Sequence, residues 1–136
     1  MNITILIAAH KPYWMPSDPV YLPLQVGAEG ESLIPGYTPD NTGDNISAKN
    51  PHYCELTGLY WAWKNLSCEY IGLCHYRRYF GHRVHTDDLE RKKAAIFSGA
   101  DYEKLLGQYD VILPVKRNYY IETVRSQYEH AHYKKD

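Results

Sequence analysis

Residues 70–80 read YIGLCHYRRYF and join the end of an expected buried strand to a cluster of basic residues. Its first half is apolar and strand-like, and it ends abruptly in His75, Tyr76, Arg77 and Arg78. Charged side chains are rarely buried without a partner, so two adjacent guanidinium groups after a buried strand need a reason. In α/β proteins, ligands bind beyond the carboxyl ends of the strands, and the planar arginine side chain matches phosphate oxygens. The stretch therefore predicts a site for an anionic small molecule and favours a phosphorylated one.

A second basic pair points to the same edge of the sheet. Residues 2–9 form a continuous aliphatic and β-branched run, which predicts a strand buried on both faces of a parallel sheet. His10 and Lys11 follow it directly, so parallel strands would bring the two basic clusters together. The alternative is a pair of surface turns, with Lys11 solvated and the arginines paired with acids such as Glu69 or Asp87.

Composition and charge limit the class of protein. The chain has 136 residues, of which 44% are hydrophobic, and this predicts one domain over 1–136. The formal net charge of −1 argues against a nucleic-acid partner. We expect no transmembrane segment, because no apolar run reaches about 18 residues, and no secretory signal, because the start lacks a basic leader. Three cysteines without a Cys-x-x-Cys pair argue against disulfides or a cysteine zinc site and favour the cytoplasm.

The order strand, loop, helix, strand predicts an α/β fold with a mostly parallel sheet and flanking helices. Asn50 as N-cap and Pro51 at the first helical position predict a helix over 51–65. Its expected apolar face is Tyr53, Leu56, Tyr60 and Trp63. The aromatic residues Tyr60, Trp61 and Trp63 have two readings, core packing or a stacking platform. The other expected elements are strands over 21–26 and 110–115 and helices over 86–97, 101–106 and 121–134.

A polar segment precedes the helix that is expected from residue 51. Free backbone N–H groups at a helix start favour anions, which would suit Lys49 and Asn50 as ligand-binding residues. Asp44 could instead accept a hydrogen bond from a hydroxyl group of a ribose or a sugar, and Asn45 belongs to the same polar segment. The alternative for all four residues is plain turn and cap chemistry.

Metal and nucleotide motifs give weak signals. His130 and His132, together with His75, raise the possibility of a metal site, but side chains at i and i+2 do not share a helix face. The chain contains neither a Gly-x-x-x-x-Gly-Lys loop nor a Gly-x-Gly-x-x-Gly sequence, so a P-loop or a Rossmann dinucleotide site is not indicated.

Several blocks of this sequence are highly specific. They are IAAHKPY over 7–13, YLPLQVG over 21–27, GDNISAKN over 43–50, YCELTGLYWAWKN over 53–65 and the stretch 70–80. Together they resemble a bacterial family known only as a domain of unknown function, whose members are labelled as capsular, exopolysaccharide or lipopolysaccharide biosynthesis glycosyltransferases. The similarity covers nearly the whole chain. Gln127, Tyr128 and the His130/His132 pair resemble the family's later segment.

The resemblance implies a GT-A-like fold, similar to a Rossmann fold, that uses a nucleotide sugar. In such folds an Asp-x-Asp sequence usually ends the strand after the central helix and holds a divalent metal on the diphosphate. Residues 75–78 occupy the corresponding place here, and cationic side chains could neutralise the leaving diphosphate instead. The resemblance therefore predicts metal-independent glycosyl transfer without a cofactor, with Mn²⁺ or Mg²⁺ as the alternative.

Roles for individual residues follow from the resemblance. It places His10 and Lys11 near the nucleotide, Asp44 and Asn45 near the ribose or the donor sugar, and the arginines on the diphosphate. The candidate catalytic bases are Glu55, His75 and Asp44. The implied partners are a nucleotide-sugar donor and a polysaccharide or lipid-linked acceptor, in the cytoplasm or at the inner face of the plasma membrane.

Family members generally continue beyond this length, so the resemblance also predicts a fold that is incomplete at the C-terminus. An incomplete sheet exposes an edge and apolar surface, which would favour association of two copies. The alternative function is therefore an inactive domain that binds nucleotide or sugar, or serves as an interaction module.

Overall fold

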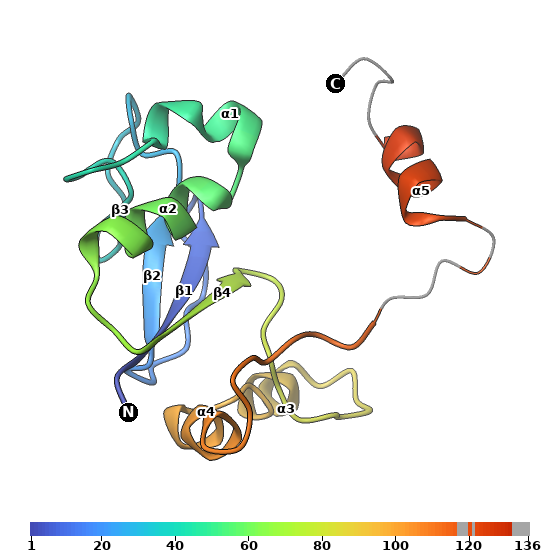
Figure 1. The fold of residues 1–136 in the computed structure, drawn as a ribbon. Helices are drawn as coiled ribbons and strands as arrows, with labels where there is room; N and C mark the ends of the chain where they lie inside the picture. The colour runs from blue at the N-terminus through green and yellow to red at the C-terminus, as the bar shows by residue number, and fades with distance from the viewer. Residues whose placement is uncertain (117–119, 121, 132–136) are drawn as a thin grey trace.

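The computed structural model describes residues 1–116, 120 and 122–131. Its centre is a parallel sheet with the strand order β3-β2-β1-β4 (Figure 1). The strands are β1 (Ile3–Ala9), β2 (Tyr21–Gln25), β3 (Thr38–Pro39) and β4 (Tyr70–His75). The helices are the 3-10 turn η1 (Ser47–Lys49), α1 (Asn50–Tyr53), α2 (Leu56–Asn65), α3 (Leu89–Ala94), α4 (Gly99–Leu106) and α5 (Val124–Ala131). The predicted parallel α/β sheet is confirmed, and the short strand β3 is an addition to it.

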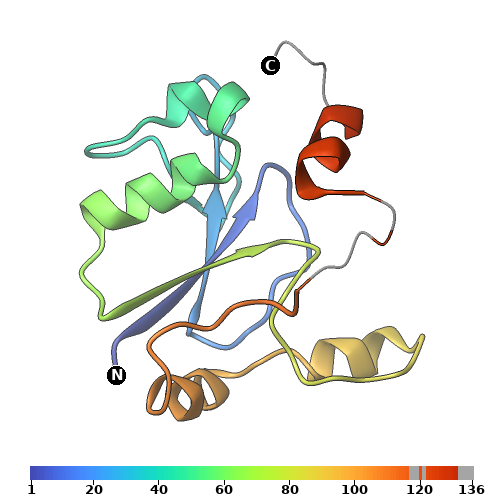
Figure 2. The ribbon, with the colours of Figure 1, turned by 45° about the vertical axis from the view of Figure 1, so that its right-hand side comes forward.

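Side chains of β1 alternate between two apolar layers. Leu6 and Ala8 pack with Trp61 and Ala62 of α2 on one face. Ile5 and Ile7, on the other face, join a cluster that includes Tyr102 of α4. Because both faces of β1 are covered, a strand without polar alternation is stable there. Figure 2 shows α2 on one side of the sheet and α3 and α4 on the other.

A glycine sets the distance between α2 and the sheet. A Cβ atom on Gly58 would lie 2.6 Å from Leu24 Cδ2 and 2.8 Å from Val26 Cγ1. Any larger residue would therefore push α2 away from β2. The buried residues of α2 are Thr57, Gly58, Trp61 and Ala62.

The apolar face predicted for this helix is wrong. Tyr53, Leu56 and Trp63 are exposed, and Trp63 retains 66% of its accessible surface. The close approach at Gly58 turns the helix side with the buried residues Thr57, Gly58, Trp61 and Ala62 inward, so Leu56 and Trp63 face solvent. Trp61 does pack in the core, where its Nε1 donates to Thr42 Oγ1 at 2.9 Å.

The helix predicted over 51–65 is broken at Cys54. This residue has φ 49° and ψ −131°, a backbone conformation that non-glycine residues rarely adopt. The Asn50 side chain holds the break by donating to Cys54 O at 2.8 Å and to Thr57 Oγ1 at 3.1 Å. Asn50 is therefore not the N-cap, because η1 runs directly into α1 and Lys49 takes that position.

No strand forms over 110–115, contrary to the sequence prediction. Ile112 packs partly buried against the cluster on the α4 side of the sheet. Val111, Leu113 and Val115 are 67–88% exposed, so nothing in the described chain covers the other apolar side chains of this run. Pro114 also lacks the N–H that a ladder would need. In the described residues β4 therefore ends the sheet.

The later helices are shorter than predicted or begin earlier. Of residues 86–97 only Leu89–Ala94 form α3, and Asp88 caps it by accepting from Glu90 N at 2.9 Å. The helix predicted from 101 begins at Gly99, because Ser98 and Asp101 form a capping box. The helix predicted over 121–134 is α5, and residues 121 and 132–134 lie outside the described part.

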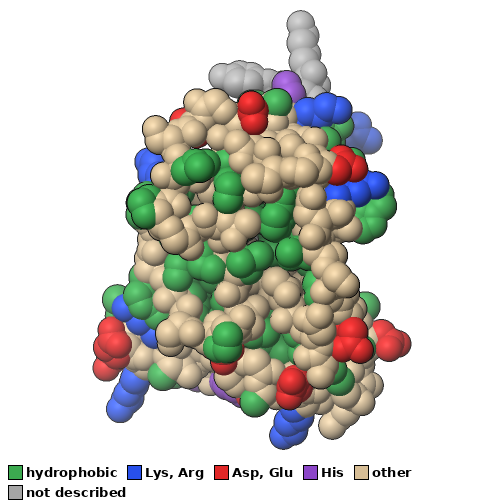
Figure 3. All heavy atoms as spheres, turned by 90° about the vertical axis from the view of Figure 1, so that its left-hand side faces the viewer, with side chains coloured by type: hydrophobic (Ala, Val, Ile, Leu, Met, Phe, Trp, Pro, Cys, Tyr) green, Lys and Arg blue, Asp and Glu red, His purple; other side chains and the backbone are tan. Residues whose placement is uncertain are grey.

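Charge is distributed unevenly over the face of the molecule that Figure 3 shows. Hydrophobic side chains form a band across the middle of this face, and charged side chains lie mainly above and below it. The strands run roughly vertically in Figure 1, so these charges lie toward the two ends of the sheet.

Candidate functional site

The carboxyl ends of β1 and β4 lie next to each other. The parallel register pairs Ala8 with His75, so His10 and the residues after His75 emerge at the same edge of the sheet. The structure thus brings together the two basic clusters that the sequence pattern assigned to one edge.

A tight turn follows β4 and separates the two arginines. Arg78 N donates to His75 O at 2.8 Å, and Arg77 N donates to His75 Nδ1 at 3.4 Å. Both arginine side chains are exposed, and neither pairs with Glu69 or Asp87 in the described structure. Instead each lines a different hollow. The surface-turn reading is therefore correct about exposure, but the ion pairs that it assumed are not formed.

The first hollow lies between the two strand ends and has a volume of about 240 Å³. We call it the histidine hollow, and it is lined by Ala8, Ala9, His10, Val26, Asn50, Cys54, Glu55 and His75. The break at Cys54 places Glu55 at the start of α2, beside this hollow. Four of the candidate residues from the sequence, on three different segments, therefore share one concavity.

Burial and charge set the protonation of His75. Desolvation lowers its pKa below the ordinary 6.5, and the neighbouring Glu55 carboxylate partly opposes this by raising the pKa. Arg77, Arg78 and His10 lower it further by charge repulsion. The imidazole is therefore neutral near pH 7 and can accept a proton.

A second hollow of about 390 Å³ lies beside the free edge of β4. We call it the edge hollow, and it is lined by Glu55, Leu56, Leu73, Cys74, His75, Arg78, Tyr79, Phe80 and Pro114. Glu55 and His75 line both hollows, so two groups that can accept protons stand between two separate concavities.

The third and largest hollow, of about 560 Å³, is rich in aromatic residues. We call it the aromatic groove, and three segments line it. They are Tyr13 and Trp14 in the loop after β1; Tyr76, Arg77, Tyr79, Phe80, Gly81, His82 and Val84 after β4; and Leu89, Lys92, Lys93, Ala95 and Ile96 in α3 and the residues after it. Arg78 does not line this groove. The Tyr13 and Tyr76 rings stack with centroids 3.7 Å apart. The Tyr76 ring also lies 5.9 Å from that of His10, which links the groove to the histidine hollow. The sequence hypothesis assigned neither Tyr13 nor Trp14 to a site, and Tyr13 was visible only as part of the block IAAHKPY.

A buried carboxylate that the sequence hypothesis also missed holds this part of the fold together. Asp40 is fully buried and accepts four hydrogen bonds. Its donors are Gly27 N at 2.9 Å, Ala28 N at 3.0 Å, Ser47 Oγ at 2.5 Å and Thr57 Oγ1 at 2.6 Å. Because Thr57 also accepts from Asn50, the network connects the loop after β2 with η1 and the break at Cys54. It thereby positions Glu55.

The predicted residues Asp44, Asn45 and Lys49 line none of these three hollows. Asp44 accepts from the Tyr60 hydroxyl at 3.0 Å and lies 4.0 Å from Lys64 Nζ, so it sits beside the second half of α2. Glu55 is five residues before Tyr60, which at 1.5 Å per residue is about 8 Å along the helix axis. Asn45 Oδ1 accepts from Ser47 N, which is turn chemistry. Lys11 is exposed beside His10.

The described residues contain no group of three or more His, Cys, Asp or Glu side chains that could hold a metal ion. His130 pairs with Glu122, and His132 lies outside the described part of the chain. Metal-independent transfer stays a prediction. The described helices are also too short or too polar to cross a bilayer.

The comparisons with known proteins identify the family. Residues 4–136 match the family model "Domain of unknown function (DUF4422)", and the chain therefore belongs to this family. No curated protein matches the sequence. A solved structure, "WbbM bifunctional glycosytransferase apo structure", is similar with a TM-score of 0.59 and 39% sequence identity. The similarity covers 65% of this chain and 16% of that one, so this chain corresponds to a small part of WbbM. The domain is glycosyltransferase-like, with an α/β fold of the GT-A-like type.

Proposed function

We propose that this chain is a glycosyltransferase, or its donor-binding part, that binds a nucleotide sugar at the carboxyl ends of β1 and β4. The observation that carries the proposal is the meeting of His10, Glu55 and His75 in one hollow, with Arg77 and Arg78 on the turn beside it. The identity of 39% to a glycosyltransferase structure supports the same reading. Similarity of the fold alone would not support the proposed function, because one fold serves many activities.

The proposed reaction is attack of an acceptor hydroxyl on the anomeric carbon of the donor sugar. The bond between that carbon and the diphosphate breaks, and the nucleoside diphosphate leaves. Arg77 and Arg78 would stabilise the charge that develops on the diphosphate. Glu55 or the neutral His75 would accept the proton of the hydroxyl. Asp44 is the weakest of the three candidate bases, because it is engaged by Tyr60 and Lys64 away from the hollow.

The proposed setting is bacterial surface-polysaccharide assembly at the cytoplasmic side of the membrane, with a polysaccharide or lipid-linked acceptor. Sequence resemblance to such enzymes is its support.

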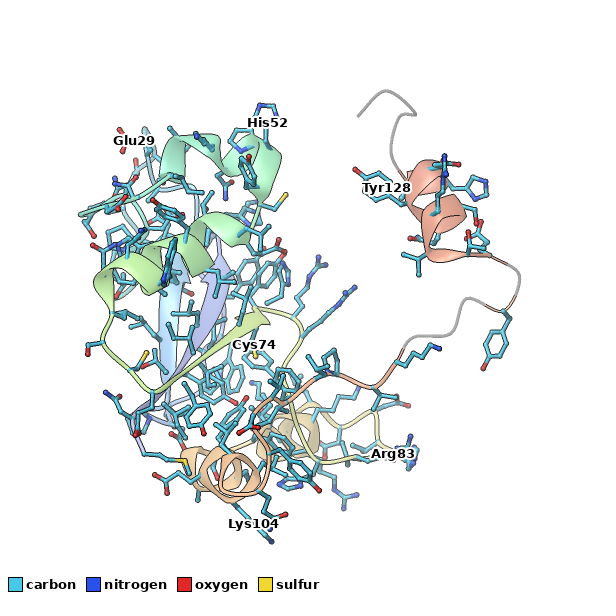
Figure 4. All side chains as sticks on the ribbon, viewed as in Figure 1. Glu29, His52, Cys74, Arg83, Lys104 and Tyr128 are labelled. Carbon is cyan, nitrogen blue, oxygen red and sulfur yellow. The ribbon has the colours of Figure 1, made fainter. Side chains whose placement is uncertain are left out.

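Calorimetric titration with uridine, thymidine and guanosine diphosphates tests donor binding. We expect at least one of them to bind and the double variant Arg77→Ala/Arg78→Ala to lose it. Arg83→Ala is the matched control, because Arg83 is exposed on the following loop and lines none of the three hollows (Figure 4). Unchanged affinity in the double variant would place the diphosphate elsewhere.

Turnover is tested by release of sugar from the donor. Glu55→Gln and His75→Gln should reduce turnover while the diphosphate still binds. Activity that disappears in chelator and returns with Mn²⁺ would reject the metal-independent mechanism.

A second candidate is a domain that binds nucleotide or associates with another polypeptide without turnover. Among the described residues no second strand pairs with β4, and the side chains of Leu56, Ile71 and Leu113 are exposed; both features favour this candidate, because such surfaces mark interaction sites. A second copy of this chain, paired edge to edge, is the partner that we propose. Binding of a nucleoside diphosphate without any donor turnover would support this candidate.

A further inference from the structure

The aromatic groove has a composition that the proposed donor site does not explain. Its floor is formed by aromatic rings, with Trp14 46% exposed, and Val84 and Leu89 extend the apolar lining. Its volume of about 560 Å³ is that of a typical small-molecule site. The Trp14 ring meets that of Tyr79 edge to face, with centroids 6.3 Å apart, so the floor is preformed.

The charges that line the groove are all positive. Arg77 lies where the groove meets the turn after β4, and Lys92 and Lys93 lie in the last turn of α3. Lys93 Nζ is 4.7 Å from the centre of the Trp14 ring. Its ion pair with Glu90, at 3.4 Å, involves a carboxylate that is 82% exposed, and such pairs contribute little. Lys93 can therefore exchange this partner for an anionic ligand at small cost.

Tyr79 adds no negative charge to the groove. Burial raises the pKa of Tyr79 to about 12, so its phenol is neutral at physiological pH. Its hydroxyl is buried and has no hydrogen-bond partner among the described residues.

The groove offers few side chains that accept hydrogen bonds from sugar hydroxyls or from the N–H groups of bases. No aspartate, glutamate, asparagine, glutamine, serine or threonine lines it. A saccharide buried there would find donors in the lysines and His82 but few acceptors for its own hydroxyl groups, and each unpaired buried hydroxyl costs free energy. A hydrocarbon chain has no such groups, and the lysines match a phosphate at its end.

We propose that the aromatic groove binds an amphiphilic anion, a hydrocarbon chain that carries a phosphate or diphosphate head. The chain would lie on the rings of Trp14 and its neighbours, and the head beside the two lysines of α3, with Arg77 left to the donor diphosphate. The role of this ligand as the lipid carrier of the acceptor rests on the proposed function. The contact of Tyr76 with both Tyr13 and His10 places such a head next to the histidine hollow.

Farnesyl diphosphate is the probe, and its binding to the full chain is measured by calorimetry and by quenching of tryptophan fluorescence. Inorganic pyrophosphate and farnesol are the two halves of the probe. We expect farnesyl diphosphate to bind at least tenfold more tightly than either half. Lys92→Ala/Lys93→Ala should weaken binding at least tenfold, and Trp14→Phe should abolish most of the quenching without loss of affinity. Lys104→Ala is the matched control, because Lys104 is exposed on α4, outside the groove (Figure 4).

Nucleoside diphosphate binding is measured on the same variants. It should survive Lys92→Ala/Lys93→Ala and be lost in Arg77→Ala/Arg78→Ala. Binding of the nucleoside diphosphate but not of farnesyl diphosphate would overturn this inference and leave the proposed function intact. Binding of farnesyl diphosphate but not of any nucleoside diphosphate would overturn the proposed function and leave the groove as a lipid-phosphate site.

Two further results would overturn the inference. One is equal affinity for pyrophosphate and farnesyl diphosphate, which would show that the hydrocarbon contributes nothing. The other is binding to phosphatidylglycerol vesicles that depends on the two lysines while farnesyl diphosphate in solution does not bind. That result would identify a membrane surface rather than a pocket for a single chain.

Discussion

The two flanks of β1, the side of β2 and the side of β4, differ in how far the described sheet and its hydrogen bonds extend. On the β2 flank the sheet continues to β3, and a fully buried carboxylate, Asp40, connects the following loop with η1 and α2. On the β4 flank the described sheet ends, and apolar side chains such as Ile71 and Leu113 remain exposed. The β2 flank is thus closed by a further strand and a buried hydrogen-bond network, whereas the β4 flank carries the cationic turn and ends the described sheet.

The largest effect is expected from the β2 flank. Asp40→Ala leaves two backbone N–H groups and the buried hydroxyls of Ser47 and Thr57 without their acceptor. We expect a loss of about 3–5 kcal/mol in the free energy of unfolding, measured by urea denaturation. Asp44→Ala, which removes an exposed carboxylate, should cost less than about 1 kcal/mol. Equal costs for the two variants would mean that the buried carboxylate of Asp40 contributes no more to stability than an exposed one.

The open edge is tested by self-association. If β4 pairs with a second copy, Ile71→Lys should raise the dissociation constant roughly tenfold, because lysine on an edge strand disfavours pairing. Analytical ultracentrifugation over a concentration series measures this. Leu33→Lys is the matched control, since Leu33 is 62% exposed in the loop between β2 and β3. An equal effect of both substitutions would remove the distinction between the flanks.

The break between α1 and α2 lies at Cys54, whose backbone conformation is strained. Cys54→Gly should stabilise the fold by about 0.5–1 kcal/mol, because glycine adopts a φ of 49° without a steric penalty. Cys68→Gly is the control, because Cys68 has no positive φ and should show no gain. Differential scanning calorimetry resolves the difference, and a destabilised Cys54→Gly would show that the cysteine side chain supports the break.

The smallest effect concerns the pKa of His75 on the open flank. Glu55→Gln should lower this pKa further, because the carboxylate raises it, and Arg77→Ala/Arg78→Ala should raise it. NMR titration of the imidazole measures both shifts. The folded pKa lies below the unfolded value near 6.5, so the neutral ring favours the fold above that pH, and this contribution is lost as pH falls through the folded pKa. A transfer rate that depends on His75 as base should fall over the same pH range.

Local pattern was sufficient for β1, β2 and β4 and for the edge of the sheet where the basic residues gather. The continuous apolar run of β1 and the abrupt polarity change after Cys74 are visible in the sequence itself. The strand predicted over 110–115 failed because a strand needs a partner edge, which no local pattern supplies. The break at Cys54 depends on Asp40 and Thr57, which are distant in sequence from each other, and no periodicity reveals that they meet.

Distance along the sequence also explains which site residues the sequence hypothesis missed. His10 and His75 follow apolar runs and were therefore visible as candidates. Trp14 and Lys93 belong to segments that meet only through folding, so their shared groove had no sequence signal. Asp44 was expected near the ligand because of its polar neighbours, but its bond to Tyr60 draws it to the far half of α2.

The three cysteines differ in a way that makes the molecule easy to label. Burial raises the pKa of Cys74, which leaves its thiol largely unreactive, and Cys68 is partly covered. Cys54 is exposed, and it lines the hollow that holds Glu55 and His75. A maleimide fluorophore on Cys54 would therefore report directly on the arrival of small molecules at the strand ends, without any engineered attachment point.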